Sequence, residues 1–564
     1  MNIAKTLSSS PTIRRYPLQL KLQNMEILRQ FQSLAWCKPD WCYPSMGKET
    51  NDLLRRCLDV PAVEVSDDVE EVIRRSQEFP VPFPIDSCRM HILKSSVPID
   101  KLKRNIVSAY PIIHERVLLL MTHFLIYKRE FGSPIEKAFY KDMTVPEFID
   151  RLLLKRAITF MGQKDTYKLI SGKRGNEGWD AVGTLHEKPP LTLDSVLSYD
   201  EMKISAMVYV SSRTHFINNG SRDNAGVVQS DGGGVESDGV IIGLIGPRFE
   251  RKGRMDYEDM LITEQQNSPE NGYGEEVTPT TCLNVLKTTY VRNNQSTKHM
   301  WRQMWSEFYQ VHSYTYEELT SYVNITDKSD EKEKYTSRYV KVPNNEDTIF
   351  DNEVYYKRLS IPFDCALLEA NERAREDGKM AFLNVIGIGL GVWKISAHQA
   401  DVFILTLLER LRAYLKRDLL DHVSDVNFAY VKPSDSISAL FSKAEVENDD
   451  SASSEKRIFF ESKRHPNGGI NVQLENRNPS DKLPEEHAGK LLVVTYPWDG
   501  NAQPGNEFWI DSLTGSGDPA AACSTQIAEL HNAHINTAVS SSRVRVASSR
   551  GLLSLKDVCS SRLP

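Results

Sequence analysis

Apolar runs typical of buried strands alternate with helical patterns along the chain, and this alternation constrains the fold more than any other feature. The strand-like runs stand at residues 201–212, 239–249, 381–386, 425–431 and 490–496, with shorter ones at 457–462 and 470–474. Helical patterns stand at residues 296–323, 362–379 and 396–420. Together they predict an α/β fold with a layered, largely parallel sheet flanked by helices. In such sheets ligands bind at the carboxyl ends of the strands, so the loops that follow the strands are the most informative.

The regions outside this alternation differ from it in composition and in apolar pattern. We expect an irregular segment (1–44), a helical N-terminal domain (45–165), a sheet domain (195–545) and a disordered tail (546–564). The helical domain is predicted from strongly apolar stretches that end in a glycine stop. The tail is predicted from its Ser- and Arg-rich composition. Residues 440–488 are polar and are expected to form an excursion from the sheet domain.

Composition argues against several classes of protein. The chain has 564 residues, a formal net charge of -7 and 40% hydrophobic residues, typical of a globular protein and not of a nucleic-acid binder. No apolar stretch reaches the roughly 18 residues of a membrane span, and the N-terminus lacks a secretory pattern. The eight cysteines show no zinc-site spacing, so we expect reduced thiols, no metal and a cytoplasmic location, with a nuclear one as the alternative.

The segment NVIGIGLGVWK places Gly387, Gly389 and Gly391 between a strand pattern and a helical one. Glycine weakens a strand, so its repeated use indicates that something approaches the backbone closely. Bare amides ahead of a helix N-terminus suit a diphosphate, with Val392 and Trp393 beside it. Close packing of the helix on the sheet is the alternative. The spacing departs from the G-x-G-x-x-G dinucleotide pattern.

Acidic residues follow the strand pattern 239–249, in the segment GRMDYEDM. Asp256, Glu258 and Asp259 stand near a helix start, where negatively charged side chains interact favourably with the helix dipole. They also suit hydrolysis of a glycosidic bond, in which carboxylates stabilise positive charge on the sugar or orient the attacking water. Four nearby basic residues could meet phosphate or simply be solvated: Arg248, Arg251, Lys252 and Arg254.

A dense polar segment, WDGNAQPGNEFW, follows the strand pattern 490–496. It is typical of a recognition loop, and its tryptophans Trp498 and Trp509 offer flat surfaces for a base or ribose. Downstream, Asp518 is either a helix N-cap ahead of Pro519 or a residue that binds the ligand. The candidates within the loop are Asp499, Gly500, Asn501, Asn506 and Glu507.

Asn218 and Asn219 follow the strand pattern 201–212. Their amides could bond sugar hydroxyls, although Asn-Gly is equally typical of a plain turn. The sequence contains no Walker A, GxSxG or HExxH motif, so these polar loops are the features that carry its chemistry.

At these residues the sequence resembles the macrodomain and poly(ADP-ribose) glycohydrolase superfamily. FINNGS, a GGG loop, GRMDYEDMLI, GIGLGVW and YPWDGN follow one another in the order found there. The segment WDGNAQPGNEFW with SGDPAAACST is similar to a divergent macrodomain family that includes a bacterial effector removing ADP-ribose from arginine of ubiquitin. The likeness covers roughly residues 195–545.

This resemblance implies a macrodomain-like sheet that binds ADP-ribose without a further cofactor. The expected partner is an ADP-ribosylated protein, with ubiquitin as one such protein, and the reaction a metal-free hydrolysis. Met255-Asp256-Tyr257 stands where the glycohydrolases carry paired glutamates, so removal of a single ADP-ribose, from arginine among other side chains, is favoured over release of poly(ADP-ribose). Two alternatives stay open: a non-catalytic reader of ADP-ribose, and a nucleotide- or NAD-linked enzyme.

The resemblance also assigns roles to the candidate residues. Catalysis is assigned to the acids Asp256, Glu258, Asp259, Asp499 and Glu507. Binding of ADP-ribose is assigned to Asn218, Asn219, Gly387, Gly389, Gly391, Val392, Trp393, Trp498, Gly500, Asn501, Asn506 and Asp518.

Overall fold

The computed structural model describes residues 18–61, 63–229, 234–274, 285–322, 325, 331–343, 345–441 and 457–564. Of the glycine triplet at 232–234, only Gly234 lies within these ranges.

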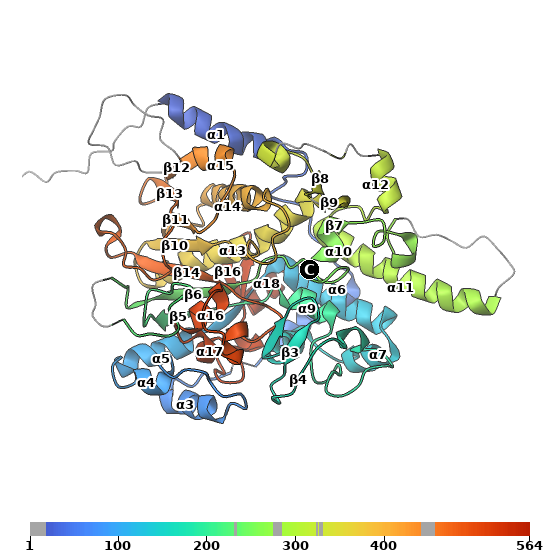
Figure 1. Cartoon of the computed structure of the whole chain (residues 1–564), viewed down its shortest axis with the longest axis horizontal. Coiled ribbons are helices and arrows are strands. Elements are labelled where there is room, and N and C mark those ends of the chain that lie inside the picture. Colours follow the sequence, from blue (N-terminus) through green and yellow to red (C-terminus); the bar gives the residue numbers. More distant parts are fainter. Residues whose placement is uncertain are drawn as a thin grey trace, which may run out of the picture.

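A ten-stranded sheet forms the centre of the molecule, with helices on both sides (Figure 1). The mixed α/β fold predicted from the alternating pattern is thereby confirmed. The strands, in spatial order, are β12 (Arg457–Glu461), β13 (Gly469–Leu474), β11 (Val423–Ala429), β10 (Ala381–Ile386), β14 (Leu491–Pro497), β6 (Asp238–Leu244), β5 (Tyr209–His215), β1 (Tyr110–His114), β15 (Arg545–Ser548) and β16 (Gly551–Ser554). Two small sheets hold β2 (Thr159–Met161), β3 (Thr166–Lys168) and β4 (Arg174–Gly175), and β7 (Leu261–Ile262), β9 (Asn345–Asp351) and β8 (Tyr339–Val342).

Five neighbouring strands, β13, β11, β10, β14 and β6, run parallel, so their carboxyl ends share one edge of the sheet. The loops after β6, β14 and β10 are therefore neighbours. Strand β5 is antiparallel to β6, pairing Val210 with Gly243 and His215 with Asp238, so it ends at the opposite edge.

Helices α13 and α14 lie on one side of the sheet, and α5, α16 and α17 lie on the other (Figure 1). The helices are α1 (Leu18–Ser33), α2 (Lys48–Arg56), α3 (Val69–Glu78), α4 (Met90–Leu93), α5 (Ile99–Ser108), α6 (Glu115–Phe131), α7 (Pro134–Tyr140), α8 (Val145–Leu154), α9 (Tyr199–Ser205), α10 (Tyr257–Met260), α11 (Val285–Tyr309), α12 (Tyr316–Tyr322), α13 (Asn352–Glu376), α14 (Gln399–Leu415), α15 (Asp435–Ser438), α16 (Gly517–Ala522), α17 (Ile527–Leu530) and α18 (Leu555–Arg562).

The N-terminal region is helical, but it differs from the separate helical domain that we expected. Strand β1 lies inside the central sheet, between β5 and β15. Its residues run directly into the apolar helix α6, so nothing in the sequence separates the two elements. One hydrophobic core extends from Leu28 to Cys559 and includes side chains of both regions. Helix α1 also occupies part of the segment expected to be irregular.

The C-terminal tail, expected to be disordered, instead forms β15, β16 and α18. Val546 and Ala547 of β15 are fully buried where the strand pairs with β1. Arg562 of α18 forms an ion pair with Glu115 of α6. A four-residue strand is too short to give an alternating signal against a Ser- and Arg-rich background, which explains the difference.

The run at 201–212 also differs, because its first part is helix α9 and only its second part is strand β5. Ser198 caps this helix in a reciprocal capping box with Glu201, which fixes where it begins.

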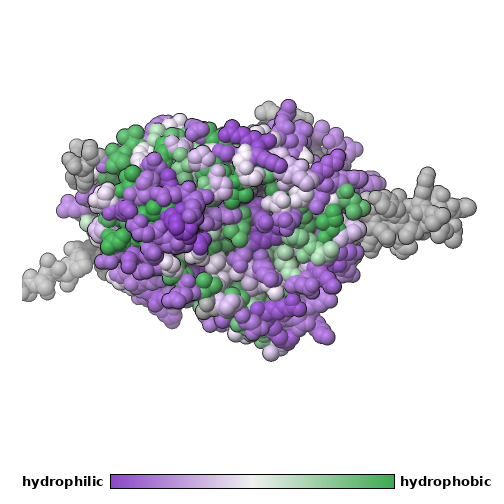
Figure 2. All heavy atoms as spheres, turned by 90° about the horizontal axis from the view of Figure 1, so that it is seen from below, coloured by the Kyte–Doolittle hydropathy of each residue, from purple (hydrophilic) through white to green (hydrophobic). Residues whose placement is uncertain are grey.

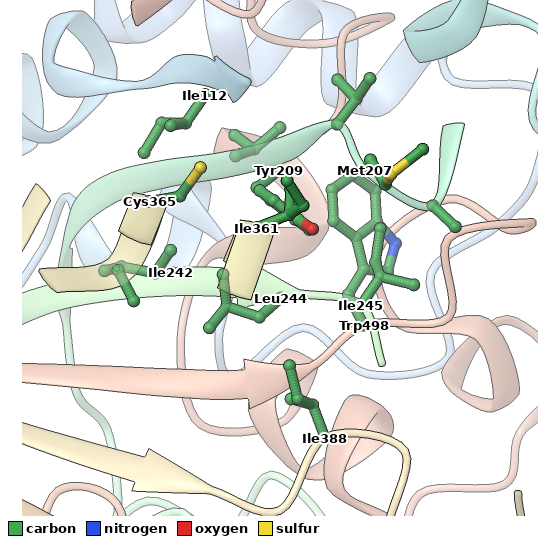
Figure 3. Close-up of a cluster of buried hydrophobic side chains, with 14 of the residues drawn as sticks. Ile112, Met207, Tyr209, Ile242, Leu244, Ile245, Ile361, Cys365, Ile388 and Trp498 are labelled. Atoms are coloured by element: carbon green, nitrogen blue, oxygen red, sulfur yellow. The ribbon is translucent and has the colours of Figure 1, made fainter. Parts of the chain in front are cut away.

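Apolar side chains fill the space under the carboxyl edge of the sheet. Figure 3 shows Leu244, Ile245, Trp498 and Ile388 gathered where β6, β14 and β10 end. All four are at most 2% exposed. The face in Figure 2 is mostly hydrophilic, with hydrophobic residues scattered across it. Within the described ranges, no helix is both long and apolar enough to cross a membrane.

Candidate active site

The glycine-rich loop after β10 packs against the segment after β6. A Cβ added to Gly246 would lie 2.3 Å from the backbone nitrogen of Gly389. Gly389 has a φ of +73°, and its own Cβ would lie 3.1 Å from Pro247. Glycine is therefore required at both positions by the close approach of two backbones. Contact between these two segments, and not the packing of the helix on the sheet given as the alternative, thus accounts for Gly389.

The tip of the same loop is open. A Cβ on Gly391 would meet nothing within 4 Å, and the following Val392 is 94% exposed. The three atoms nearest to a Cβ added at Gly387 all belong to Leu390 of the same loop. The exposed amides after Gly389 are therefore the part of the loop that a ligand could approach.

Helix α14, which follows the loop, begins later than the sequence suggested. Its N-cap residue is His398, whereas the predicted helical pattern starts at residue 396. The Gln399 side chain instead accepts hydrogen bonds from the backbone N–H groups of Ile395 and Ser396. Ser396 is bonded to the His398 ring, at 2.6 Å. Two backbone donors ahead of the helix are thus already occupied.

Arg248 connects the segment after β6 with the other two loops. Its Nη1 lies 3.4 Å from Asp499 Oδ1, and its Nη2 donates to Glu250 at 2.8 Å. The guanidinium lies 5.4 Å from the ring centre of Trp393 and 5.0 Å from that of Phe160. Its Nε is buried without a partner among the described residues. The Arg248 side chain therefore joins the glycine-rich loop to the loop that follows β14. We call this second loop, residues 498–511, the acidic loop.

Asp499 is the acid that follows β14. Besides Arg248, it accepts hydrogen bonds from the Asn506 side chain at 3.0 Å and from the backbone N–H of Asn501 at 3.3 Å. Burial raises the pKa of Asp499 to about 6, the Arg248 charge opposes this rise, and the Glu507 carboxylate adds to it. A carboxyl group with this pKa can take up or release a proton near neutral pH.

Asp518 holds the acidic loop in shape. Its carboxylate accepts hydrogen bonds from the backbone N–H groups of Gly505 at 2.9 Å, Asn506 at 3.1 Å and Asp499 at 3.4 Å. Helix α16 begins at Gly517 with Ser516 as its N-cap residue, so Asp518 is not the cap of this helix. Burial and the nearby Glu507 raise the pKa of Asp518. The half-buried Glu507 accepts from Ser516 at 3.1 Å.

The other candidates in this loop shape its interior. Asn506 also bonds to the backbone of Phe160 through both its amide atoms. Asn501 donates to the sulfur of Met255. Trp498 is 1% exposed and lies beneath the Arg156 guanidinium, so its ring is part of the core and offers no open surface for a base. A Cβ on Gly500 would lie 2.6 Å from Ile245.

Asp256 is a buried residue that contacts the backbone of Arg248. It accepts from the backbone N–H of Arg248 at 2.9 Å and forms an ion pair with Arg358 of α13 at 3.0 Å. Asp256 is 2% exposed, and Arg358 is fully buried. Its carboxylate is thus occupied by protein donors and positions the segment after β6.

Glu258 and Asp259 face α9 and α11. Both form ion pairs with Lys203 and Arg302. Although burial raises the pKa of Glu258, the two cations outweigh burial and hold it at about 2. Burial raises the pKa of Asp259 despite the same cations. The structure therefore places these two acids in an ion-pair cluster, whereas Asp499, Glu507 and Asp518 form a separate group.

Asn218 and Asn219 follow β5, which ends at the opposite edge of the sheet. The Asn218 amide donates to Asn224 and to the carbonyls of Val227 and Cys523. It is 2% exposed. Asn219 accepts from the backbone N–H of Ser221 within a turn. These contacts agree with the turn interpretation.

Three residues at this edge were absent from our candidate set: Gly246, Glu250 and Phe160. Gly-Pro directly after a buried strand was the one available signal, because it marks a place where another backbone can approach. Phe160 lies in β2, about 90 residues before Arg248 in the chain, and no local pattern connects the two. Among the described residues, no group of three or more His, Cys, Asp or Glu side chains is arranged to hold a metal ion.

The fold and this edge together define an α/β protein with a glycine-rich loop and a cluster of carboxylates at the ends of parallel strands. Comparison with known proteins adds the chemistry. A family model described as "ADP-ribosylhydrolase MavL-like" matches residues 70–561. The chain belongs to this ADP-ribosylhydrolase family, and it is a hydrolase.

Two Drosophila melanogaster proteins are similar over most of their length. ADP-ribosylarginine hydrolase CG3568 is 43% identical over 487 residues, covering 86% of this chain and 87% of its own. ADP-ribosylarginine hydrolase CG2909 is 38% identical over 496 residues, covering 88% and 89%. The expected resemblance to a divergent ADP-ribosylhydrolase family is thereby confirmed.

Proposed function

We propose that this enzyme removes single ADP-ribose groups from arginine side chains of modified proteins. The names of the two Drosophila relatives support arginine as the linkage. The observation that supports the proposed site is the contact of Arg248 with both Asp499 and Trp393, because it brings the Asp499 carboxylate near the glycine-rich loop.

In the proposed complex, the diphosphate of ADP-ribose binds at the open end of the glycine-rich loop, near Gly391 and Val392. Exposed backbone amides suit a doubly charged anion. The Arg248 guanidinium, whose Nε is buried without a partner in the described part of the chain, supplies a nearby positive charge. The sugar attached to arginine then lies towards Asp499 and Glu507, in a macrodomain-like arrangement.

The proposed reaction needs water and carboxylates. Asp499 in its ionised form accepts a proton from water, while the water oxygen bonds to the anomeric carbon of the sugar. The bond from that carbon to the guanidine nitrogen breaks, and its electron pair leaves with the nitrogen. Glu507 stabilises the positive charge that develops on the sugar. The proton on Asp499 then passes to the leaving guanidine nitrogen, directly or through solvent, so the unmodified arginine side chain and ADP-ribose are formed.

The proposal is tested by incubating the protein with arginine-ADP-ribosylated ubiquitin and measuring free ADP-ribose. We expect release, and we expect the same rate after treatment with a metal chelator. Tight binding without release would instead indicate a reader of ADP-ribose. Turnover of NAD would indicate a nucleotide-linked enzyme.

The pH dependence should follow the ionisation of Asp499. Its pKa of about 6 means that the carboxyl is protonated below that pH and ionised above it. A base must be ionised, so kcat/KM should fall as the pH is lowered through about 6. Because the Arg248 charge lowers this pKa, Arg248→Gln should move the fall to higher pH, and Arg248→Lys should move it less. An unchanged profile in both variants would contradict the assignment.

Gly391→Ala separates ligand binding from folding. The added methyl meets nothing within 4 Å, so the variant should unfold at the same temperature as the wild type. If the diphosphate lies against this backbone, calorimetry should show ADP-ribose binding weakened by about tenfold, which corresponds to ~1.4 kcal/mol. Wild-type affinity in the folded variant would place the diphosphate elsewhere.

A further inference from the structure

A polar cavity of about 910 Å³ lies between the segment after β6, helices α10 and α11, and strand β9. It shares the segment after β6 with the candidate active site, because Arg248 contacts Asp499 whereas Arg251 and Arg254 line the cavity. The two regions are thus joined by one short piece of chain that is fixed by hydrogen bonds at both ends.

The wall formed by this segment is held in place. Arg251 and Arg254 both bond to Asp180, at 2.9 and 2.6 Å. Glu258 of α10 is held by Arg302 of α11 at 2.6 Å. These ion pairs shape the cavity, and because Arg251 and Arg254 share one acid, the five groups keep one excess positive charge.

Among the residues that the structure describes, four other charged side chains that line the cavity form no ion pair: Lys252, Lys298, Glu264 and Asp347. Lys252 and Lys298 are exposed, and among the described residues no carboxylate forms an ion pair with either. Lys298 donates to the carbonyl of Glu270 and to the Asn271 side chain. Two exposed acids, Glu264 and Asp347, also line the cavity.

This mixture of charges distinguishes between occupants. A phosphate-rich ligand would be repelled by the two acids, whereas a polypeptide carries both signs of charge and amide groups. The exposed amide side chains of Gln265 and Asn345 suit such a backbone, whereas those of Gln266 and Asn271 already donate to carbonyls of the protein. Resting on the proposed function, we propose that this cavity binds the polypeptide of the ADP-ribosylated protein, with Lys252 and Lys298 meeting an acidic side chain near the modified arginine.

The test compares three substrates that carry the same ADP-ribosylarginine: a peptide with flanking glutamates, the same peptide with glutamines, and the free amino acid. The variant is Lys252→Glu with Lys298→Glu. Both side chains are exposed, so the fold should tolerate the change. The wild type should prefer the glutamate peptide, and the variant should raise KM for that peptide by about tenfold, since each exposed ion pair contributes at most ~1 kcal/mol.

For free ADP-ribosylarginine, the variant should keep the wild-type kcat/KM within about twofold, since exposed pairs outside the reacting centre contribute little. The matched control is Lys379→Glu with Lys556→Glu, which changes two exposed lysines outside the cavity and should leave all three substrates unaffected.

Each outcome has one interpretation for the cavity. An unchanged peptide preference in the variant would overturn the proposal. An equal loss on all three substrates would also overturn it, because the cavity would then hold part of ADP-ribose. Failure of the wild type to release ADP-ribose from any of the three substrates would contradict the proposed function instead. In that case, the fluorescence anisotropy of labelled peptides still measures the charge preference of the cavity.

Discussion

Asp499→Asn should lower kcat by about 10²–10⁴-fold, the usual contribution of a positioned general base. The amide has the same shape as the carboxyl group and can still accept a hydrogen bond from Arg248, but it cannot accept a proton from water. Binding of ADP-ribose should change little, because the proposed diphosphate site lies at Gly391 and Val392. Single-turnover release of ADP-ribose measures the chemical step, and calorimetry measures the binding.

The matched control for this variant is Asp511→Asn, in the same loop. Asp511 is exposed and has a φ of +66°, a conformation that asparagine adopts readily. We expect it to retain wild-type activity. If Asp499→Asn keeps more than about a tenth of the wild-type kcat, a general base is excluded at this position. The same measurement on Glu507→Gln would then show whether Glu507 takes that role.

Much of the edge could be predicted from the sequence because it depends on local patterns. Short apolar runs give the strands β6, β10, β11 and β14, and parallel strands bring the loops that follow them to one edge. The sequence therefore predicts that a ligand binds at the loops that follow these strands. The contact of Arg248 with Asp499 shows that the loops after β6 and β14 are neighbours.

Other features could not be predicted, because they depend on partners far away in the chain. The direction of β5 is not encoded in its apolar run, so the sequence did not reveal that Asn218 lies at the opposite edge. The role of Asp256 depends on Arg358, which is about 100 residues away, and that of Glu258 depends on Lys203 and Arg302. An acid that is paired inside the protein has the same sequence pattern as one that faces a substrate.

The ion pair of Arg358 with Asp256 connects the core to the candidate active site. Arg358 Nη2 also donates to the carbonyls of Ala206 at 3.0 Å and Ile245 at 3.3 Å. Ile245 directly follows β6, and Asp256 binds the backbone of Arg248. One buried side chain thus fixes both ends of the segment that carries Arg248.

Arg358→Met should therefore destabilise the protein by about 3–5 kcal/mol, because it leaves the buried Asp256 carboxylate without its cation. Urea unfolding measures this loss, and Arg375→Met is the control, since Arg375 pairs with Glu372 on the surface and should contribute at most about 1 kcal/mol. In the variant that remains folded, kcat should also fall, because Arg248 is no longer held beside Asp499. Arg358→Met with Asp256→Leu should recover stability but not activity, since it removes the unpaired charge and still leaves the backbone of Arg248 without its acceptor. Recovery of both would show that the ion pair serves folding alone.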